Sequence, residues 1–264
     1  MTGSDGRDEP STPSEPDAHG FDALDGAIDR SLASWKTNDV PICVLFSGGV
    51  DSGVLAWELR RNRALSLVTV GTPAGTDLEA ARVAAPRIGA HWIGAEVSTA
   101  EIAEVAHRID RTFGPLPRTS RSVLVAFSLA LAHAPDRVVL CGQGADELFL
   151  GYRHFHGLTA EAAAARATSD LRVLREVDWP RAQAVARSLD RAVVAPFLAE
   201  EFIAAALAIP IEQRLPADEP KRWFRDWAAR RGLPTDLARR PKRALQFGSG
   251  VDRVLRRMPP AGSP

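Results

Sequence analysis

The feature that most constrains the fold of this chain is an alternation of short apolar runs with segments of helical pattern. Four runs of six or seven residues, rich in valine, isoleucine and leucine, occupy positions 40–46, 65–70, 91–97 and 136–141. A continuous apolar run bounded by turn residues is typical of a strand buried on both faces of a parallel sheet. Because such strands need crossover connections, the alternation predicts an α/β fold with a doubly wound parallel sheet.

The rest of the chain predicts one domain with a helical extension. Residues 1–18 are mostly Ser, Pro, Asp, Gly and Glu, which cannot bury enough surface to offset the entropy of ordering, so we expect a disordered tail. The domain is predicted to cover 19–252, with an α/β core to about 156. No convincing strand follows Gly151, so 157–252 is predicted to be helical, and 253–264 to be a loose tail.

Composition narrows the possible functions. Lys+Arg and Asp+Glu are equal at 33 each, so no basic excess argues for a nucleic-acid partner and no acidic excess argues against one. Cys43 and Cys141 lie in apolar runs and are expected to be buried free thiols in a reducing compartment. Neither a signal-peptide pattern nor 18 consecutive apolar residues occurs, so we expect a cytoplasmic protein with no membrane span.

The first predicted strand ends in a glycine loop, "VLFSGGVDSG", residues 44 to 53. Glycine allows positive φ and lets an anion approach the backbone, and the following helix N-terminus adds N–H donors and partial positive charge. The hydroxyls of Ser47 and Ser52 can donate as well. The loop therefore predicts a phosphate cradle.

This loop differs from the two common phosphate-binding motifs. No lysine follows the glycines as in a Walker loop, and the spacing is not that of a dinucleotide loop. Asp51 would repel a phosphate unless a cation intervened, which indicates Mg²⁺ between this carboxylate and phosphate oxygens. The alternative is a tight turn in which Asp51 caps the helix.

A second loop, "CGQGADELFLGY" (residues 141 to 152), follows the fourth predicted strand and carries Asp146 and Glu147. In a parallel sheet the carboxyl ends of the strands lie at one edge, where ligands bind at the topological switch point. We therefore expect Asp51 and Asp146 to share one Mg²⁺. The alternative for Asp146 is an N-cap.

At this point the sequence resembles a known family. "SGGVDS" (residues 47 to 52) resembles the PP-loop of N-type ATP pyrophosphatases, and "CGQGADELFLGYRHFH" (residues 141 to 156) is similar to a segment of the asparagine synthetase synthase domain. "RAVVAPFL", "KRWFRDW" and "RRPKRALQFGSG" resemble further segments of that family, in the same order. The resemblance covers roughly residues 40 to 252.

The resemblance implies a set of site residues. Catalytic roles fall to Lys242, Asp51 and Asp146, of which the two carboxylates would ligate Mg²⁺. Substrate-pocket candidates are Gln143, Gly144 and Glu147. ATP and pyrophosphate would contact Leu45, Ser47, Gly48, Gly49, Val50, Asp51, Ser52, Val70, Gly142 and Lys242. The alternative for Lys242 is a solvated member of the basic run 239–243.

The resemblance also implies a reaction, in which a carboxylate, by default L-aspartate, is adenylated by ATP and then joined to ammonia or an amine. Thr2 stands where the glutamine-hydrolysing enzymes carry a cysteine, and only about 46 residues precede the loop, so we expect no glutaminase domain. Ammonia would be free or delivered by a separate glutaminase subunit. Gln143 stands where the family often has Glu and cannot take a proton, which leaves open how the amine is activated.

Three other functions remain open from the sequence. One is amidation or ring closure of a different carboxylate, as in β-lactam synthetase relatives. Another is tRNA thiolation by a PP-loop enzyme, for which Cys141 alone is poor support. The third is a nucleotide-sensing subunit with a degenerate site, which the retention of Asp51, Asp146 and Lys242 disfavours.

Overall fold

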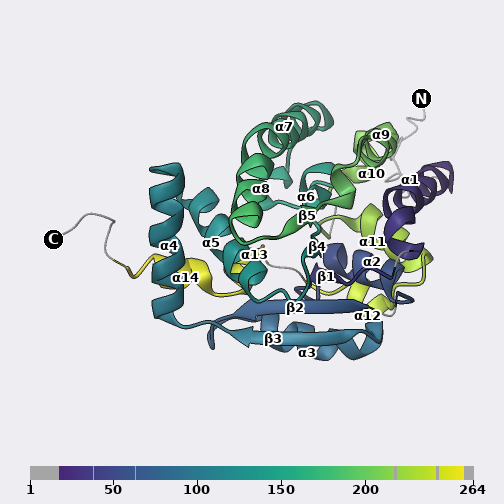
Figure 1. The fold of residues 1–264 in the computed structure, drawn as a ribbon. Helices are drawn as coiled ribbons and strands as arrows, with labels where there is room; N and C mark the ends of the chain where they lie inside the picture. Colours follow the sequence, from purple (N-terminus) through teal and green to yellow (C-terminus); the bar gives the residue numbers. More distant parts are fainter. Residues whose placement is uncertain (1–17, 38, 63, 217–218, 242–243, 259–264) are drawn as a thin grey trace, which may run out of the picture.

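The computed structural model describes residues 18–37, 39–62, 64–216, 219–241 and 244–258. Its centre is a five-stranded parallel sheet in the order β3-β2-β1-β4-β5, which can be followed from bottom to top in Figure 1. The strands are β1 (Ile42–Leu45), β2 (Leu65–Gly71), β3 (His91–Glu96), β4 (Val138–Leu140) and β5 (Ala192–Val194). Strand order reverses direction between β1 and β4, so the predicted doubly wound sheet is confirmed.

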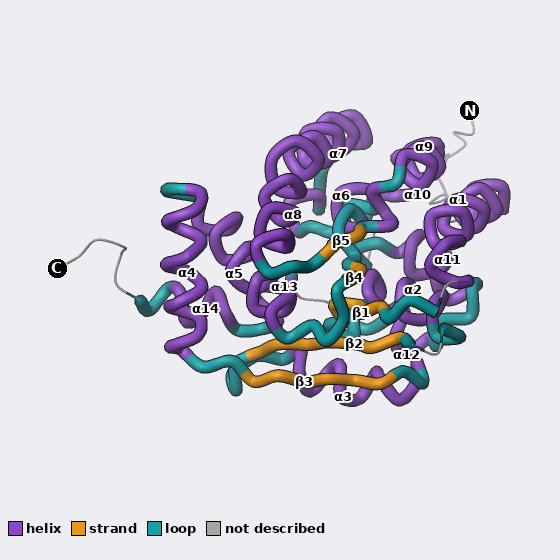
Figure 2. Tube along the Cα trace, viewed as in Figure 1, coloured by secondary structure: helices purple, strands orange, loops and turns teal. Residues whose placement is uncertain are grey.

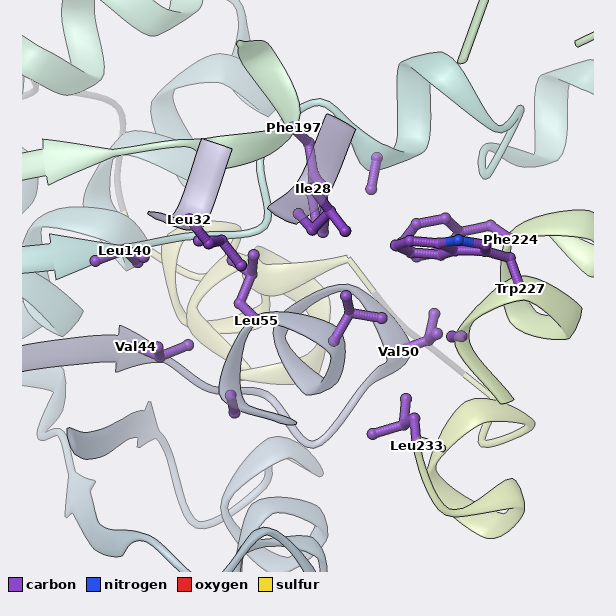
Figure 3. Packing of buried hydrophobic residues seen from close by; sticks show 14 of the residues in the cluster. Ile28, Leu32, Val44, Val50, Leu55, Leu140, Phe197, Phe224, Trp227 and Leu233 are labelled. Carbon is purple, nitrogen blue, oxygen red and sulfur yellow. The ribbon is translucent and has the colours of Figure 1, made fainter. Parts of the chain in front are cut away.

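The side chains of alternate strand residues lie in two separate hydrophobic cores, one on each face of the sheet. Val44 and Leu140 lie in the first core and Cys43 and Val139 in the second, as expected for side chains that alternate along a strand. Figure 3 shows the first core, in which Val44 and Leu140 lie near Leu32 and Leu55 while Phe224 and Trp227 of α11 (Arg222–Arg230) lie at the other side of the cluster. Cys43 and Cys141 are buried free thiols, as predicted.

Helices of the first core are α1 (Ala18–Thr37), α2 (Val50–Leu59), α3 (Asp77–Ile88), α6 (Ala145–Leu148), α9 (Glu200–Ala208), α11 (Arg222–Arg230) and α12 (Thr235–Ala238). Those of the second are α4 (Thr99–Phe113), α5 (Arg118–Ala132), α8 (Trp179–Ser188) and α14 (Val251–Leu255). The remaining elements are η1 (Arg153–Phe155), α7 (Ala160–Val173), η2 (Leu174–Asp178), η3 (Pro196–Leu198), α10 (Ile211–Arg214) and α13 (Leu245–Gly248). Of these, α7 and η3 each contribute one residue to the first core, Leu171 and Phe197. None of the helices in the described ranges is long and apolar enough to cross a membrane.

The prediction that no strand follows Gly151 was wrong. β5 pairs in parallel with β4 and adds an edge strand that the helical part of the chain contributes (Figure 2). Its three residues follow Arg191 and are only partly buried, so they lack the continuous apolar pattern that marks a central strand. Of the two predicted tails, residues 1–17 and 259–264 lie outside the described ranges, whereas residues 253–255 belong to α14 (Val251–Leu255).

The segments "TDLE" (residues 76 to 79) and "STAE" (residues 98 to 101) each have the pattern that predicts a capping box, and one of the two boxes is present. At the start of α4, Ser98 Oγ accepts from the Glu101 N–H, and Glu101 Oε2 accepts from the Ser98 N–H at 2.8 Å. At the start of α3, Thr76 makes no such bond. Its ψ of −14° is not the extended value that an N-cap needs, because its N–H is held by the Gly248 carbonyl at 2.7 Å.

The chain between Ala160 and Ser188 is helical throughout, whereas its sequence pattern predicts separate helices over 159–168, 170–177 and 179–189. α7 passes into a π-helical segment, η2, and then into α8 without leaving the helical region of backbone conformation. Such segments are uncommon and often occur at functional sites. In this chain η2 contributes to the wall of the cavity described next.

Candidate active site

The two glycine loops leave the sheet side by side, at the point where strand order reverses. β1 and β4 are neighbours, with Cys43 opposite Val139 and Val44 opposite Leu140, so the loops that follow them start at the same edge. A cavity of about 860 Å³ opens there. Its apolar part includes Leu45, Val70 and Phe127, and its polar part carries the carboxylates of the two loops.

The first loop has the conformation that its glycines predict. Gly48 has φ of +70°, and the Gly53 N–H bonds the Gly49 carbonyl at 2.9 Å, so α2 starts immediately after the turn. Ser52 Oγ accepts from the Ser47 N–H at 3.2 Å and lies 3.5 Å from Ser47 Oγ. These bonds place two hydroxyls at the mouth of the loop and direct the N-terminus of α2 toward the cavity.

An arginine supports this loop from outside the cavity. Arg240 Nη1 donates to the Ser47 carbonyl at 3.1 Å, and a Cβ on Gly48 would lie 2.5 Å from the same nitrogen. The backbone of Arg240 is held in turn by the buried Arg225, which donates to its carbonyl at 3.0 Å. The same Cβ would lie 2.9 Å from the backbone oxygen of Ala80, so glycine is required here by contact as well as by φ.

The two predicted metal-binding carboxylates converge on one cation. Lys221 Nζ lies 2.7 Å from Asp51 Oδ1 and 2.6 Å from Asp146 Oδ1, and only 2% of the lysine side chain is exposed. Lys221 precedes α11 with φ of +59°, in the left-handed region that few side chains adopt. Backbone conformations of this kind occur at functional sites, where the surrounding structure holds them.

Two glycines make room for this arrangement. A Cβ on Gly151 would lie 2.1 Å from Asp146 Oδ1 and 2.2 Å from Lys221 Cε. A Cβ on Gly142 would lie 2.9 Å from the Cβ of Asp51. The position between the carboxylates is therefore shaped by both loops.

The donor set suits Mg²⁺, and the lysine ammonium is a stand-in for a bound cation. Mg²⁺ in nucleotide enzymes is commonly held by one or two carboxylates together with substrate phosphates. Within the described ranges no group of three or more His, Cys, Asp or Glu side chains is arranged to hold a metal without a substrate. Asp51 and Asp146 fit the two-carboxylate type of site.

Glu147 lies next to this pair and has a different environment. Its carboxyl is 6% exposed and accepts from the Tyr152 hydroxyl at 2.6 Å. Burial, with a smaller contribution from the charge of Asp146, raises the pKa of Glu147 to about 7. Burial also raises the pKa of Tyr152 well above 10, so the phenol remains a donor at neutral pH.

Most of the predicted site residues lie together. Those that line the cavity are Leu45, Ser47, Asp51, Ser52, Val70, Gly142, Gln143, Asp146 and Glu147. Gly48, Gly49 and Val50 form the loop and the start of α2 behind this surface. A Cβ on Gly144 would meet Leu198 at 2.7 Å, so this residue packs against η3 instead of lining the cavity. Lys242 is outside the described residues.

Sequence reasoning gave no role to several residues of the site. Lys221 was visible only as part of the "KRWFRDW" resemblance and as one of three lysines in a chain with 33 Lys and Arg residues. Arg240 stood within a basic run. The far wall of the cavity includes Tyr152 and His154, which lie in the segment 141–156 that carries the resemblance but were given no role. It also includes residues that lie in no motif, namely Arg166, Ser169, Asp170, Val173, Leu174 and Asp178.

Sequence comparison identifies relatives of the whole described chain. The family model for asparagine synthase matches residues 23–195 and 177–258. An asparagine synthetase [glutamine-hydrolyzing] of Brassica oleracea is 28% identical over an alignment that covers 92% of this chain and 44% of that protein. Asparagine synthetase B [glutamine-hydrolyzing] of Escherichia coli (strain K12) is 26% identical, covering 85% and 44% respectively. The chain thus spans less than half of the length of these relatives.

Similar solved structures are more distant. An NH3-dependent NAD synthetase from Campylobacter jejuni aligns with a TM-score of 0.37 at 16% identity, covering 65% of this chain and 93% of that one. An NMN synthetase from Francisella tularensis aligns with a TM-score of 0.37 at 13% identity, covering 88% and 99%.

Proposed function

Since the chain belongs to the asparagine synthase family, we propose that it is an ATP-dependent, AMP-forming carbon–nitrogen ligase. The observation that carries this proposal is the convergence of Asp51 and Asp146 on one cation beside the glycine loop. Two carboxylates and a phosphate cradle at one edge suit a metal–triphosphate complex.

The reaction has two steps in this proposal. A carboxylate oxygen of the substrate attacks the α-phosphorus of ATP, the bond from that phosphorus to the bridging oxygen breaks, and pyrophosphate leaves. The nitrogen of an amine then attacks the acyl carbon of the adenylate, and AMP leaves as the amide forms and a proton is released. Both steps need charge on phosphate oxygens to be stabilised.

Each part of the cavity has a role in these steps. Ser47, Ser52 and the start of α2 bind the outer phosphates, which become pyrophosphate. The apolar surface of Leu45, Val70 and Phe127 takes the adenosine. Asp51 and Asp146 would hold Mg²⁺, which when bound supplies positive charge to the phosphates. We also assign Lys242 to the reacting phosphates, on the resemblance of its segment to the family.

L-aspartate and ammonia are the first substrates to test, since the relatives are named asparagine synthetases. Their names state that they hydrolyse glutamine, and for this chain we propose ammonia that is either free or delivered by a glutaminase partner. Another carboxylate with another amine is the alternative, because Gln143 and the far wall of the cavity determine which acid fits.

The test is release of pyrophosphate and AMP from ATP and Mg²⁺, screened over carboxylates with ammonium or glutamine. We expect release that depends on one acid and one amine, and a loss of at least about 100-fold in Asp51→Asn. Asp236→Asn is the matched control, because that aspartate is about half exposed and pairs with Arg87 at the surface. Release that requires tRNA, or formation of ADP, would overturn the proposal.

A further inference from the structure

A buried lysine lies where the proposed metal has to bind. Lys221 Nζ is 2.7 Å from Asp51 Oδ1 and 2.6 Å from Asp146 Oδ1. Mg²⁺ binds carboxylate oxygens at about 2.1 Å. An ion that bridged the same two oxygens would overlap the ammonium. The metal and Lys221 therefore compete for one position.

From this competition we infer that Lys221 excludes divalent cations from Asp51 and Asp146 until nucleotide arrives. Lys221 is a positioning residue, since it acts through the two carboxylates. This inference rests on the proposed function, because it uses the same pair of carboxylates as metal ligands. It adds an order of events: the metal enters with the triphosphate and not before it.

The charges of the site support this order. The ammonium and the two carboxylates meet in a place where the side chains of Lys221, Asp51 and Asp146 are 2%, 6% and 19% exposed. A free divalent cation would have to displace an ammonium that is already desolvated and doubly paired, which is costly in a buried site. A metal that comes with a triphosphate brings anionic oxygens, which can accept the displaced ammonium.

The choice of lysine over arginine fits an exchangeable cation. The chain has three lysines among its 33 Lys and Arg residues, yet it places one between these carboxylates. An ammonium is a compact point charge on a flexible stem, whereas a guanidinium is a planar fork that binds a carboxylate through two bonds. The compact group can move between carboxylate and phosphate oxygens without breaking a bidentate pair.

The chain contains a matched control for the experiment. Lys36 also bridges two carboxylates, with 2.8 Å to Asp29 Oδ1 and 2.7 Å to Glu58 Oε2. This lysine is 28% exposed, and Arg231 bonds the same two carboxylates. Lys36→Met therefore removes a bridging lysine without leaving a buried pair of carboxylates.

The experiment measures Mn²⁺ binding in the absence of nucleotide, by electron paramagnetic resonance of the free ion. We expect Lys221→Met to bind one Mn²⁺ at least about tenfold more tightly than wild type, because its two carboxylates have lost their ammonium. Lys36→Met should behave as wild type. Equal Mn²⁺ affinity in wild type and Lys221→Met, whether tight or weak, would overturn the inference.

A second measurement needs no variant and covers the case in which Lys221→Met does not fold. Wild-type crystals soaked in Mn²⁺ alone should show no anomalous peak between Asp51 and Asp146, and a peak there would overturn the inference. Neither measurement requires turnover. A wild-type chain that makes AMP but takes up Mn²⁺ without nucleotide contradicts this inference alone, whereas formation of ADP contradicts the proposed function alone.

Discussion

Single residues in this site are constrained by the space between the two glycine loops. Gly151 is the tightest case, since a Cβ there would fall 2.1 Å from Asp146 Oδ1 and 2.2 Å from Lys221 Cε. Its φ is not in the positive range, so contact alone excludes a side chain. The position of Asp146 thus depends on a residue that does not take part in the chemistry.

Gly151→Ala is expected to reduce pyrophosphate release by at least about 100-fold, because a displacement of about 1 Å at a reacting group can cost that much. Gly53→Ala is the matched control, because Gly53 is a residue of α2 and a Cβ there would make an ordinary 3.5 Å contact with Leu233. This control should keep activity and gain about 0.5–1 kcal/mol in the free energy of unfolding. Normal turnover in Gly151→Ala would show that Asp146 is not held as described.

At this scale the sequence predicts the carboxylates but not their partner. Asp51 and Asp146 follow predicted strands directly, so their meeting at one edge follows from the topology of a parallel sheet. Lys221 is 170 residues from Asp51, and its position depends on how α11 packs on the first core. No spacing rule connects residues so far apart, and only the family resemblance of its segment drew attention to it.

The elements around the site are joined by a cluster of ion pairs between α1, α2 and α11. Glu58 of α2 accepts from Arg231 at 2.8 and 2.9 Å and from Lys36 at 2.7 Å, and its side chain is 9% exposed. Burial acts to raise the pKa of Glu58, but the hydrogen bonds from Arg231 and Lys36 outweigh it, and the net pKa is lowered. The cluster therefore stabilises the chain while Glu58 is ionised.

Glu58→Gln should lower the free energy of unfolding by about 2 kcal/mol at pH 7, because this is the typical contribution of a hydrogen bond to a charged group. A carboxyl group whose pKa is lower in the folded chain than in the unfolded chain stabilises the fold at pH values above its unfolded pKa, which for Glu58 is about 4.5. This stabilisation is lost as the pH falls through the pKa of the folded state. The difference between wild type and variant, measured by urea unfolding, should therefore shrink below pH 4.5. Glu79→Gln, at an exposed pair with Arg82, should match wild type. A difference that stays constant with pH would contradict this account.

Elements with a strong local pattern could be predicted, and those that depend on tertiary contacts could not. β1, β2 and β4 follow from apolar runs, since most of their residues are buried. β3 lies at the edge of the sheet with exposed and half-buried residues, so the prediction that it is buried on both faces was wrong although the strand itself is present. β5 is three residues long and partly exposed, and its pairing with β4 depends on where α8 ends. The π segment between α7 and α8 has no sequence pattern that distinguishes it from an α-helix.

For the whole molecule, the order of the strands decides where the site lies. β1 and β4 are adjacent because the sheet winds outward in both directions from this pair, and the crevice at their carboxyl ends is a binding position common to open α/β sheets (Figure 1). Helices of the later part of the chain complete the cavity, with α7 and η2 on its far wall. The fold thus places both glycine loops and the helical wall around one cavity, to which our proposal assigns the triphosphate and the acceptor.

The most direct measurement is the position of the metal in a crystal of the chain with Mn²⁺ and a non-hydrolysable ATP analogue. The account predicts one anomalous peak at about 2.1 Å from a carboxylate oxygen of Asp51 and of Asp146, with phosphate oxygens on the same ion. Lys221 should have left the position between the two carboxylates. An ion bound elsewhere, with Lys221 still bridging Asp51 and Asp146, would contradict the account.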